Sequence, residues 1–118
     1  MKRLLIIDDE PGLARLLKLA LNAAGQYDVR IANTGRDGLA VALEFQPDVV
    51  LLDVVLPDLS VGEICAALEG TPVILLTALV HSARSIAGRP VLAKPVKLEA
   101  LVASLEAATR QSSAVPAR

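Results

Sequence analysis

The chain has 118 residues, of which 53% are hydrophobic, and its 12 basic and 13 acidic side chains give a formal net charge of -1. This length fits one domain, the apolar content supplies a core, and the single cysteine excludes a disulfide framework within the chain. The sequence has no run of basic residues that could bind along a nucleic-acid backbone. It also has no apolar stretch that approaches the roughly 20 residues of a membrane span. We therefore expect a cytoplasmic domain that binds neither nucleic acid nor membrane.

Five short apolar runs predict β-strands. They are Leu4–Ile7, Val29–Ala32, Asp48–Leu52, Val73–Leu76 and Pro90–Ala93. The first, third and fourth have the continuous apolar character of strands that are covered on both faces of a parallel sheet. The second strand alternates between apolar and polar residues and is expected near an edge of the sheet. The fifth strand begins with Pro90, which has no backbone N–H group and therefore belongs at the start of a strand or on an edge strand.

Helical periodicity separates these strands. The predicted helices contain the apolar residues of Leu13–Ala24, Leu39–Phe45, Val61–Leu68 and Leu98–Leu105, with a weak additional one in His81–Ala87. Pro11 suits the first turn of the first helix, and Gly25 its end. Residues 111–118 have no apolar periodicity, so we predict a domain over residues 1–110 followed by a flexible C-terminal tail.

The alternation of strands and helices predicts an α/β fold, a doubly wound five-stranded parallel sheet with right-handed crossovers. Only the residues 78–89 are available for a loop, a helix and a return between the last two strands. We therefore expect a short or irregular fourth helix. In such sheets, functional groups gather beyond the carboxyl ends of the strands.

Polar side chains follow or end four of the five predicted strands. These residues are Asp8, Asp9, Glu10, Asp53, Thr77 and Lys94. Clustered carboxylates repel one another and need a cation, and oxygen ligands suit Mg²⁺. A carboxylate beside a metal, a lysine and a hydroxyl can act as the nucleophile of phosphoryl transfer.

Each of these residues also has an ordinary structural interpretation. The three acidic residues could begin a helix before Pro11, the Thr77 hydroxyl could bond to local backbone, and Lys94 could be a surface lysine. Asp53 ends a buried strand, and its convergence with the other groups favours the functional interpretation.

The chain contains four motifs that, taken together and in their order along the sequence, resemble those of the response-regulator receiver domains of two-component signalling. These domains have the CheY-like fold. The motifs are Leu4 to Glu10, Asp48 to Asp58, Leu75 to Ala78 and Lys94-Pro95, and the resemblance covers essentially residues 2–110. It implies a flavodoxin-like (βα)5 strand order, 2-1-3-4-5. It also implies that Asp53 accepts a phosphoryl group from a histidine kinase or a histidine phosphotransfer protein.

The same resemblance implies a Mg²⁺ cofactor. Asp9 and Asp53 would bind the ion directly, Asp8 mainly through water, and the backbone carbonyl of Val55 would complete the protein ligands. Such a domain is not an enzyme in its own right, because it assists only its own phosphorylation and dephosphorylation.

The resemblance further implies that Thr77 and Lys94 contact the phosphoryl oxygens. The backbone amides of Val54 and Ala78 would assist them. The Lys94-Pro95 bond is expected to be the cis peptide that directs this lysine.

Two features depart from the family pattern. Val91 stands three residues before Lys94, where the family carries tyrosine or phenylalanine, and valine has no ring to relocate when the threonine moves. Val55 and Leu79, each two residues beyond a site residue, cannot orient an attacking water molecule. We therefore predict slow self-dephosphorylation, which Val55→Asn or Leu79→Asn should accelerate.

Two other functions compete with the phosphoacceptor. Val91 and the short crossover would suit an atypical receiver that acts as a phosphorylation-independent protein-interaction module, although the complete set of site residues counts against it. A phosphatase of the haloacid-dehalogenase type needs a second acid two residues after the nucleophile, and Val55 occupies that position.

Overall fold

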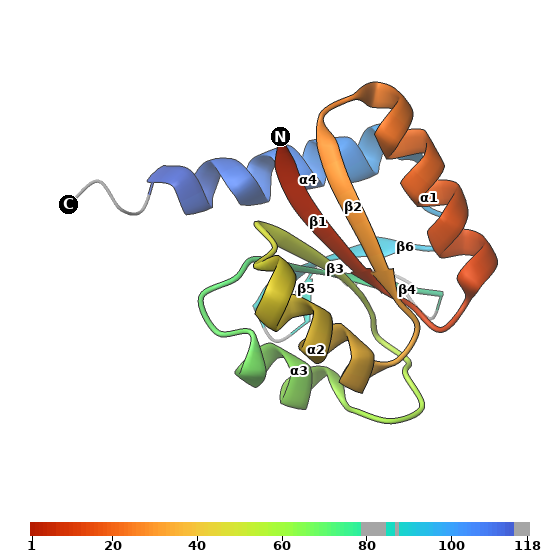
Figure 1. Cartoon of the computed structure of the whole chain (residues 1–118), viewed down its shortest axis with the longest axis vertical. Helices are drawn as coiled ribbons and strands as arrows, with labels where there is room; N and C mark the ends of the chain where they lie inside the picture. Colours follow the sequence, from red (N-terminus) through yellow and green to blue (C-terminus); the bar gives the residue numbers. More distant parts are fainter. Residues whose placement is uncertain (79–84, 87, 115–118) are drawn as a thin grey trace.

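A twisted parallel sheet forms the centre of the computed structural model, which describes residues 1–78, 85–86 and 88–114. Its described parallel strands are β1 (Lys2–Ile7), β2 (Tyr27–Ala32), β3 (Val49–Asp53), β4 (Val73–Thr77) and β6 (Arg89–Ala93). They lie in the order β2-β1-β3-β4-β6, and β5 (Ser85–Ile86) pairs antiparallel with β6 (Figure 1). The predicted flavodoxin-like order of five parallel strands is confirmed.

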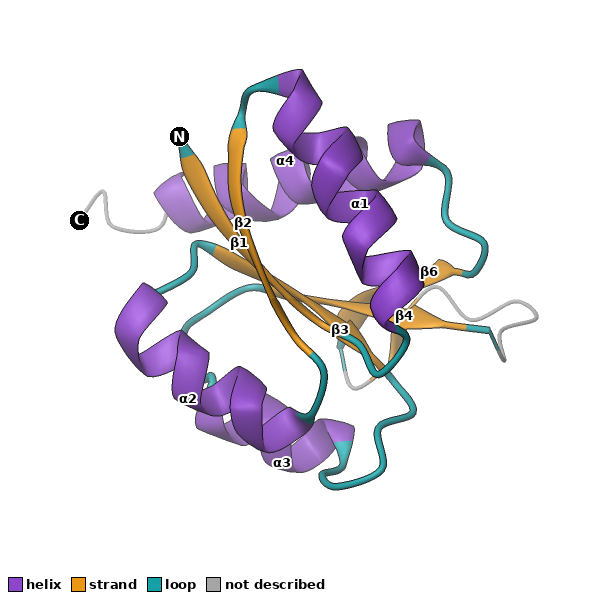
Figure 2. Cartoon of the chain, turned by 45° about the vertical axis from the view of Figure 1, so that its right-hand side comes forward, coloured by secondary structure: helices purple, strands orange, loops and turns teal. Residues whose placement is uncertain are grey.

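Helices cover both faces of the sheet (Figure 2). α1 (Pro11–Ala24) and α4 (Leu98–Ala114) lie on one face, while α2 (Gly35–Phe45) and α3 (Val61–Ala67) lie on the other. Successive strand residues point to opposite faces, so Leu4 packs with the α1 and α4 side chains and Leu5 with those of α2 and α3.

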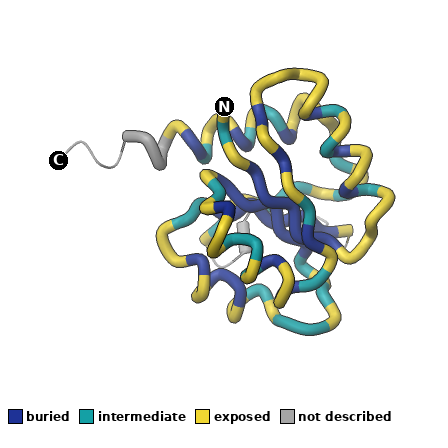
Figure 3. The backbone as a smooth tube through the Cα atoms, viewed as in Figure 1, coloured by how far each residue is buried: buried dark blue, intermediate teal, exposed yellow. Residues whose placement is uncertain are grey.

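The central strands are the most deeply buried part of the chain (Figure 3). Every residue of Leu4–Ile7 and Val49–Leu52 is fully buried, as expected for strands with helices on both faces. β2 alternates between buried and exposed residues and forms an edge of the sheet, as its sequence predicts. Cys65, on α3, is buried in the core.

The helix ends follow local signals in the sequence. Pro11 is the first residue of α1, and Gly25 ends it with a left-handed φ of 77°. The Thr34 side chain accepts a hydrogen bond from the Asp37 amide at the start of α2, and Ser60 with Glu63 forms a capping box on α3. α2 begins at Gly35, four residues before the predicted apolar stripe at Leu39.

The crossover from β4 to β6 is described only in part. Its described part holds β5, the two-residue antiparallel strand Ser85–Ile86. The sequence did not predict this strand. The rest of the expected helix, residues 81–84 and 87, lies outside the described residues, as do Leu79 and His81.

The C-terminal helix is longer than predicted. α4 continues to Ala114, so residues 111–114, assigned from the sequence to a flexible tail, are helical. The start of the tail at residue 111 was therefore wrong; polar residues such as Gln111 and Ser112 extend a helix whose apolar stripe has already ended. No helix in the described ranges is long and apolar enough to cross a membrane.

Candidate functional site

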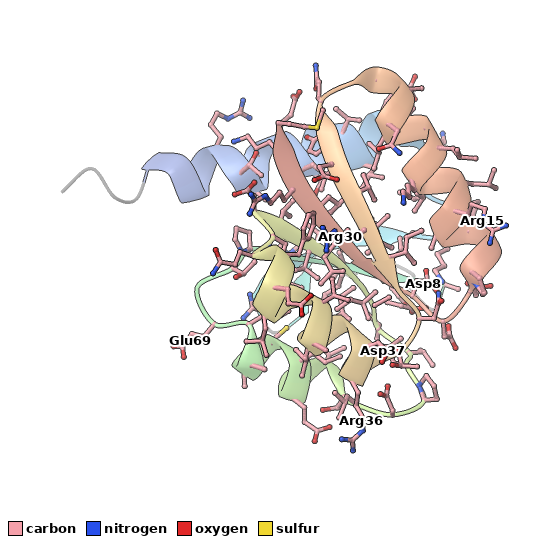
Figure 4. All side chains as sticks on the ribbon, viewed as in Figure 1. Asp8, Arg15, Arg30, Arg36, Asp37 and Glu69 are labelled. Carbon is pink, nitrogen blue, oxygen red and sulfur yellow. The ribbon has the colours of Figure 1, made fainter. Side chains whose placement is uncertain are left out.

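Four strand ends place the predicted site residues along one edge of the sheet. Asp8 directly follows β1, Asp53 ends β3, Thr77 ends β4 and Lys94 directly follows β6. Asp8, Asp53 and Thr77 are buried, with exposed fractions of 0%, 5% and 2%. Figure 4 shows Asp8 at the end of β1, beside the start of α1. The parallel strand order brings together groups that lie far apart in the sequence.

Lys94 joins the acidic groups. Its Nζ atom lies 3.1 Å from Asp53 Oδ2, 3.4 Å from Asp8 Oδ2 and 2.6 Å from Glu10 Oε1. The Lys94 amide donates a hydrogen bond to the Thr77 carbonyl oxygen at 2.8 Å, and the Lys94–Pro95 peptide bond is cis. The ammonium is thus held over the carboxyl end of β3.

These contacts determine the protonation of Lys94. Burial alone would lower its pKa, but the hydrogen bonds to Glu10 and Asp53 and the charge of Asp8 raise the pKa above its usual value. The side chain therefore remains an ammonium at neutral pH.

Asp8 is the most deeply buried carboxylate of the site. Its Oδ1 atom accepts a hydrogen bond from the Glu10 amide at 2.9 Å. Its Oδ2 atom accepts no hydrogen bond within the described part of the chain and has only the longer ion pair with Lys94. Burial raises the pKa of Asp8 to about 6; the Glu10 amide opposes this rise, and the neighbouring Asp53 adds to it. This buried oxygen is suited to a further cation or donor.

Asp53 has both carboxylate oxygens engaged. Oδ1 accepts a hydrogen bond from the Val55 amide at 3.0 Å, and Oδ2 faces Lys94. The Val54 amide, which the family resemblance assigns to the phosphoryl group, instead donates to the Leu76 carbonyl oxygen at 2.9 Å. The turn after β3 therefore orients the Asp53 carboxylate toward Lys94.

The donor set fits a divalent cation with a preference for oxygen. Asp8, Glu10 and Asp53 can each offer a carboxylate oxygen, and these oxygens lie within 4.8 Å of one another. Such ligands suit Mg²⁺. The unsatisfied Asp8 Oδ2 is the observation of this structure that supports the fit, since a buried carboxylate oxygen without a donor is costly.

A cavity opens above these groups. It has a volume of about 450 Å³ and is lined by Asp9, Glu10, Asp53, Val55, Ala78 and Lys94. Asp9 is exposed and lies in its wall rather than in the compact group of acids. The sequence therefore placed Asp8, Asp53 and Lys94 together as the structure has them. The ligand roles of Asp8, Asp9, Asp53 and the Val55 carbonyl remain predictions.

Sequence reasoning assigned no individual role to Glu10. The structure gives it the shortest contact with Lys94, across 84 positions of sequence. The only signal was its place in the acidic run after the first strand, which could not identify its partner.

Comparisons with known proteins agree with this fold. A family model described as the response regulator receiver domain matches residues 4–106. The chain is similar to the DNA-binding dual master transcriptional regulator RpaA of Synechocystis sp., with 35% identity over 98% of this chain and 52% of the relative. It is also similar to the transcriptional regulatory protein KdpE of Mycobacterium tuberculosis, with 37% identity over 97% of this chain and 54% of the relative. The chain thus spans about half the length of these relatives.

Solved structures show the same architecture. A CheY-like response regulator receiver domain protein from Methanospirillum hungatei superposes with a TM-score of 0.82 at 28% identity, covering 96% of this chain and 97% of that one. A receiver domain of a Francisella response regulator gives a TM-score of 0.83 at 24% identity, covering 95% and 99%, which supports the fold alone.

Proposed function

The chain belongs to the response regulator receiver domain family of two-component signalling, and on that premise we propose that it is a Mg²⁺-dependent phosphoacceptor. Asp53 would receive a phosphoryl group from the phosphohistidine of a histidine kinase or a histidine phosphotransfer protein. The observation that carries this proposal is the Asp53 carboxylate beside the Lys94 ammonium in the wall of an open cavity.

The proposed transfer needs a nucleophile that is fixed in place. The Val55 amide holds Asp53 Oδ1, which leaves the other oxygen directed toward Lys94 and the cavity. An oxygen of Asp53 forms the new O–P bond while the N–P bond of the donor breaks, and the imidazole of the donor leaves. Holding the carboxylate before reaction lowers the entropic part of the barrier.

Asp9, Asp53 and the Val55 carbonyl are proposed to hold Mg²⁺ directly, with Asp8 acting through water. Asp8 Oδ2, which is buried without a hydrogen-bond donor, supports a cation at this end of the sheet. When bound, Mg²⁺ neutralises charge on the acids and on the phosphoryl oxygens. A Glu10 carboxylate oxygen lies within 4.8 Å of those of Asp8 and Asp53, so Glu10 could add a ligand, or it could hold Lys94, which it contacts at 2.6 Å.

Lys94 and Thr77 complete the proposed site. The Lys94 ammonium lies 3.1 Å from Asp53 Oδ2, so it is within reach of a phosphoryl group attached there. Thr77 ends the neighbouring strand, and its carbonyl oxygen accepts a hydrogen bond from the Lys94 amide. A movement of either residue would therefore displace the other. Together they would stabilise the negative charge of the transferring group.

The proposal can be tested by titrating the protein with Mg²⁺ and then adding beryllofluoride, a phosphoryl mimic, while recording amide chemical shifts by NMR. We expect shifts around Asp9 and Asp53 on adding Mg²⁺, and further shifts around Asp53 and Lys94 that need both reagents. Asp53→Asn should lose the response to beryllofluoride. An unchanged spectrum would instead favour a protein-interaction module that acts without phosphorylation, the function that Val91 and the short β4–β6 crossover would suit.

A further inference from the structure

The first turn of α2 is capped by a side chain that comes from another loop. Asp58, in the loop between β3 and α3, accepts hydrogen bonds from the Gly35 amide at Oδ1 and from the Arg36 amide at Oδ2, both at 2.9 Å. Thr34 caps the same turn locally, since its hydroxyl oxygen accepts from the Asp37 amide at 3.0 Å. A helix start leaves these amides without partners inside the helix, so each cap satisfies real donors.

The same end of α2 is also tied to the loop after β1. The Asn33 side-chain amide donates to the Asp8 carbonyl oxygen at 3.0 Å, and the Asp8 amide donates to the Ala32 carbonyl oxygen at 3.0 Å. In Figure 4, Asp8 and the α2 residues Arg36 and Asp37 lie at the same end of the molecule, whereas Glu69, after α3, lies far from them. The start of α2 therefore touches both loops that would supply metal ligands.

Close packing holds this junction together. A Cβ atom at Gly38 would lie 2.5 Å from Ile7 Cδ1, and one at Gly35 would lie 3.0 Å from Leu59 Cβ. A side chain at Gly38 would force the Ile7 side chain to shift, and one at Gly35 would require Leu59 to move by a few tenths of an ångström. The first turn of α2 is thus fixed against the last residue of β1 and against the residue that follows Asp58.

We propose that Asp58 is a positioning residue of the metal site. By joining the β3–α3 loop to the start of α2, it would hold the Val55 carbonyl at a fixed place relative to Asp8 and Asp53, so that one Mg²⁺ ion can be bound by groups from both loops. This inference rests on the proposed function.

Between Asp53 and α3, Leu56 and Leu59 pack on the core and the Val54 amide is bonded to Leu76, but few other hydrogen bonds restrain the loop in the described structure. Val55 is anchored to Asp53 through its amide, and Ser60 is anchored to Glu63 in the capping box. Pro57, directly before Asp58, limits the backbone freedom that could decouple Asp58 from Val55. Without the Asp58 contacts, the ordering of this loop would have to occur when the metal binds, which weakens binding.

The charge of Asp58 supports this role. The Arg36 and Gly35 amides hold the pKa of Asp58 below its usual value, so the side chain is a carboxylate at neutral pH. A carboxylate at the N-terminus of α2 also interacts favourably with the helix dipole.

The test compares Asp58→Ala with Thr34→Ala, each of which removes a cap from the same helical turn, but only the first releases the β3–α3 loop. We expect Asp58→Ala to weaken the Kd for Mg²⁺, measured by calorimetric titration, about tenfold, as is typical when a residue that orients metal ligands is lost. Thr34→Ala should leave the Kd within about twofold while lowering the melting temperature to a similar degree.

A second variant covers the case in which Asp58→Ala does not fold. Asp58→Asn keeps the size and one acceptor oxygen, and should weaken Mg²⁺ binding about threefold. An unchanged Kd in the Asp58 variants, or an equal loss in Thr34→Ala, would overturn the proposal. A wild-type protein that binds no Mg²⁺ would instead remove the proposed function itself, which separates the two failures.

Discussion

Along the carboxyl edge of the sheet, the loops after β1 and β3 are built differently from the connection between β4 and β6. The first two hold buried acids, and their backbones are joined through side chains: Asn33 reaches the Asp8 carbonyl oxygen and Asp58 reaches the start of α2. Side chains from distant parts of the sequence hold these loops in one arrangement.

The β4–β6 connection is short, and its described part holds the two-residue strand β5. On β6, Val91 is partly buried and packs with the core beneath α2 and α3. Lys94 is the residue of this region that reaches the acids. The acidic groups of the first region are held with Lys94 by side-chain contacts, whereas the described part of the connection after Thr77 holds a two-residue antiparallel strand.

The largest expected effect concerns Lys94, the link between the two regions. Lys94→Ala should slow phosphorylation by acetyl phosphate about 100-fold, because the site loses a preorganised positive charge at the transferring group. The exposed Lys97, three residues later, is the matched control, and Lys97→Ala should react at the wild-type rate. Time courses of intact mass measure both rates. Equal rates for both variants would place Lys94 outside the reaction.

The next effect concerns how the buried carboxyl group of Asp8 changes the free energy of unfolding with pH when no metal is bound. The pKa of Asp8 is raised to about 6 from 3.8 in the unfolded chain, so between about pH 4 and 6 the native state binds more protons than the unfolded state. Stability contributed by this group therefore falls as pH rises through that window and stays low at pH 7.

Asp8→Asn removes the buried charge and should raise the free energy of unfolding by roughly 2 kcal/mol at pH 7 in EDTA. This increase in the free energy of unfolding should become smaller toward pH 4. Mg²⁺ should stabilise the wild type more than the variant. Urea denaturation at several pH values measures this. A variant that is less stable than the wild type at pH 7 would contradict the assigned electrostatics of the site.

A smaller effect tests the other region. Val91→Ala should lower the free energy of unfolding by about 1 kcal/mol, because part of a half-buried side chain is lost. Its rate of phosphorylation should stay within about twofold of the wild type, since Val91 contributes packing and not charge. A large loss of phosphorylation in this variant would show that the two regions are coupled more tightly than the contacts indicate.

The smallest effect concerns the lifetime of the phosphorylated protein. Val55 is exposed and lines the cavity above Asp53, where an apolar side chain cannot orient water. Val55→Asn should therefore accelerate loss of the phosphoryl group by less than about tenfold. Decay of the phosphorylated mass after removal of acetyl phosphate gives the rate, and an unchanged decay would discard this explanation.

The strands and the contacts between loops differ in how well the sequence predicted them. Leu4–Ile7 and Val73–Leu76 have the continuous apolar character of buried parallel strands, and the structure forms β1 and β4 there. Because parallel strands end at a common edge, the positions of Asp8 after β1, Asp53 at the end of β3 and Lys94 after β6 were enough to predict that they meet.

Contacts between distant loops could not be predicted in this way. The pairing of Glu10 with Lys94 and the capping of Gly35 by Asp58 depend on side-chain positions that no local pattern encodes. The early start of α2 has the same cause, since its first turn carries no apolar stripe and is held by caps. Ser85–Ile86 is too short to show any periodicity, so β5 was missed.

The central claim is that groups from β1, β3 and β6 act together on one phosphoryl group at Asp53. Its most direct test is incubation of the wild type and Asp53→Asn with acetyl phosphate, with and without Mg²⁺, followed by intact-mass measurement. The account predicts one phosphoryl group on the wild type, only when Mg²⁺ is present, and none on the variant. Modification of both proteins, or of neither, would contradict it.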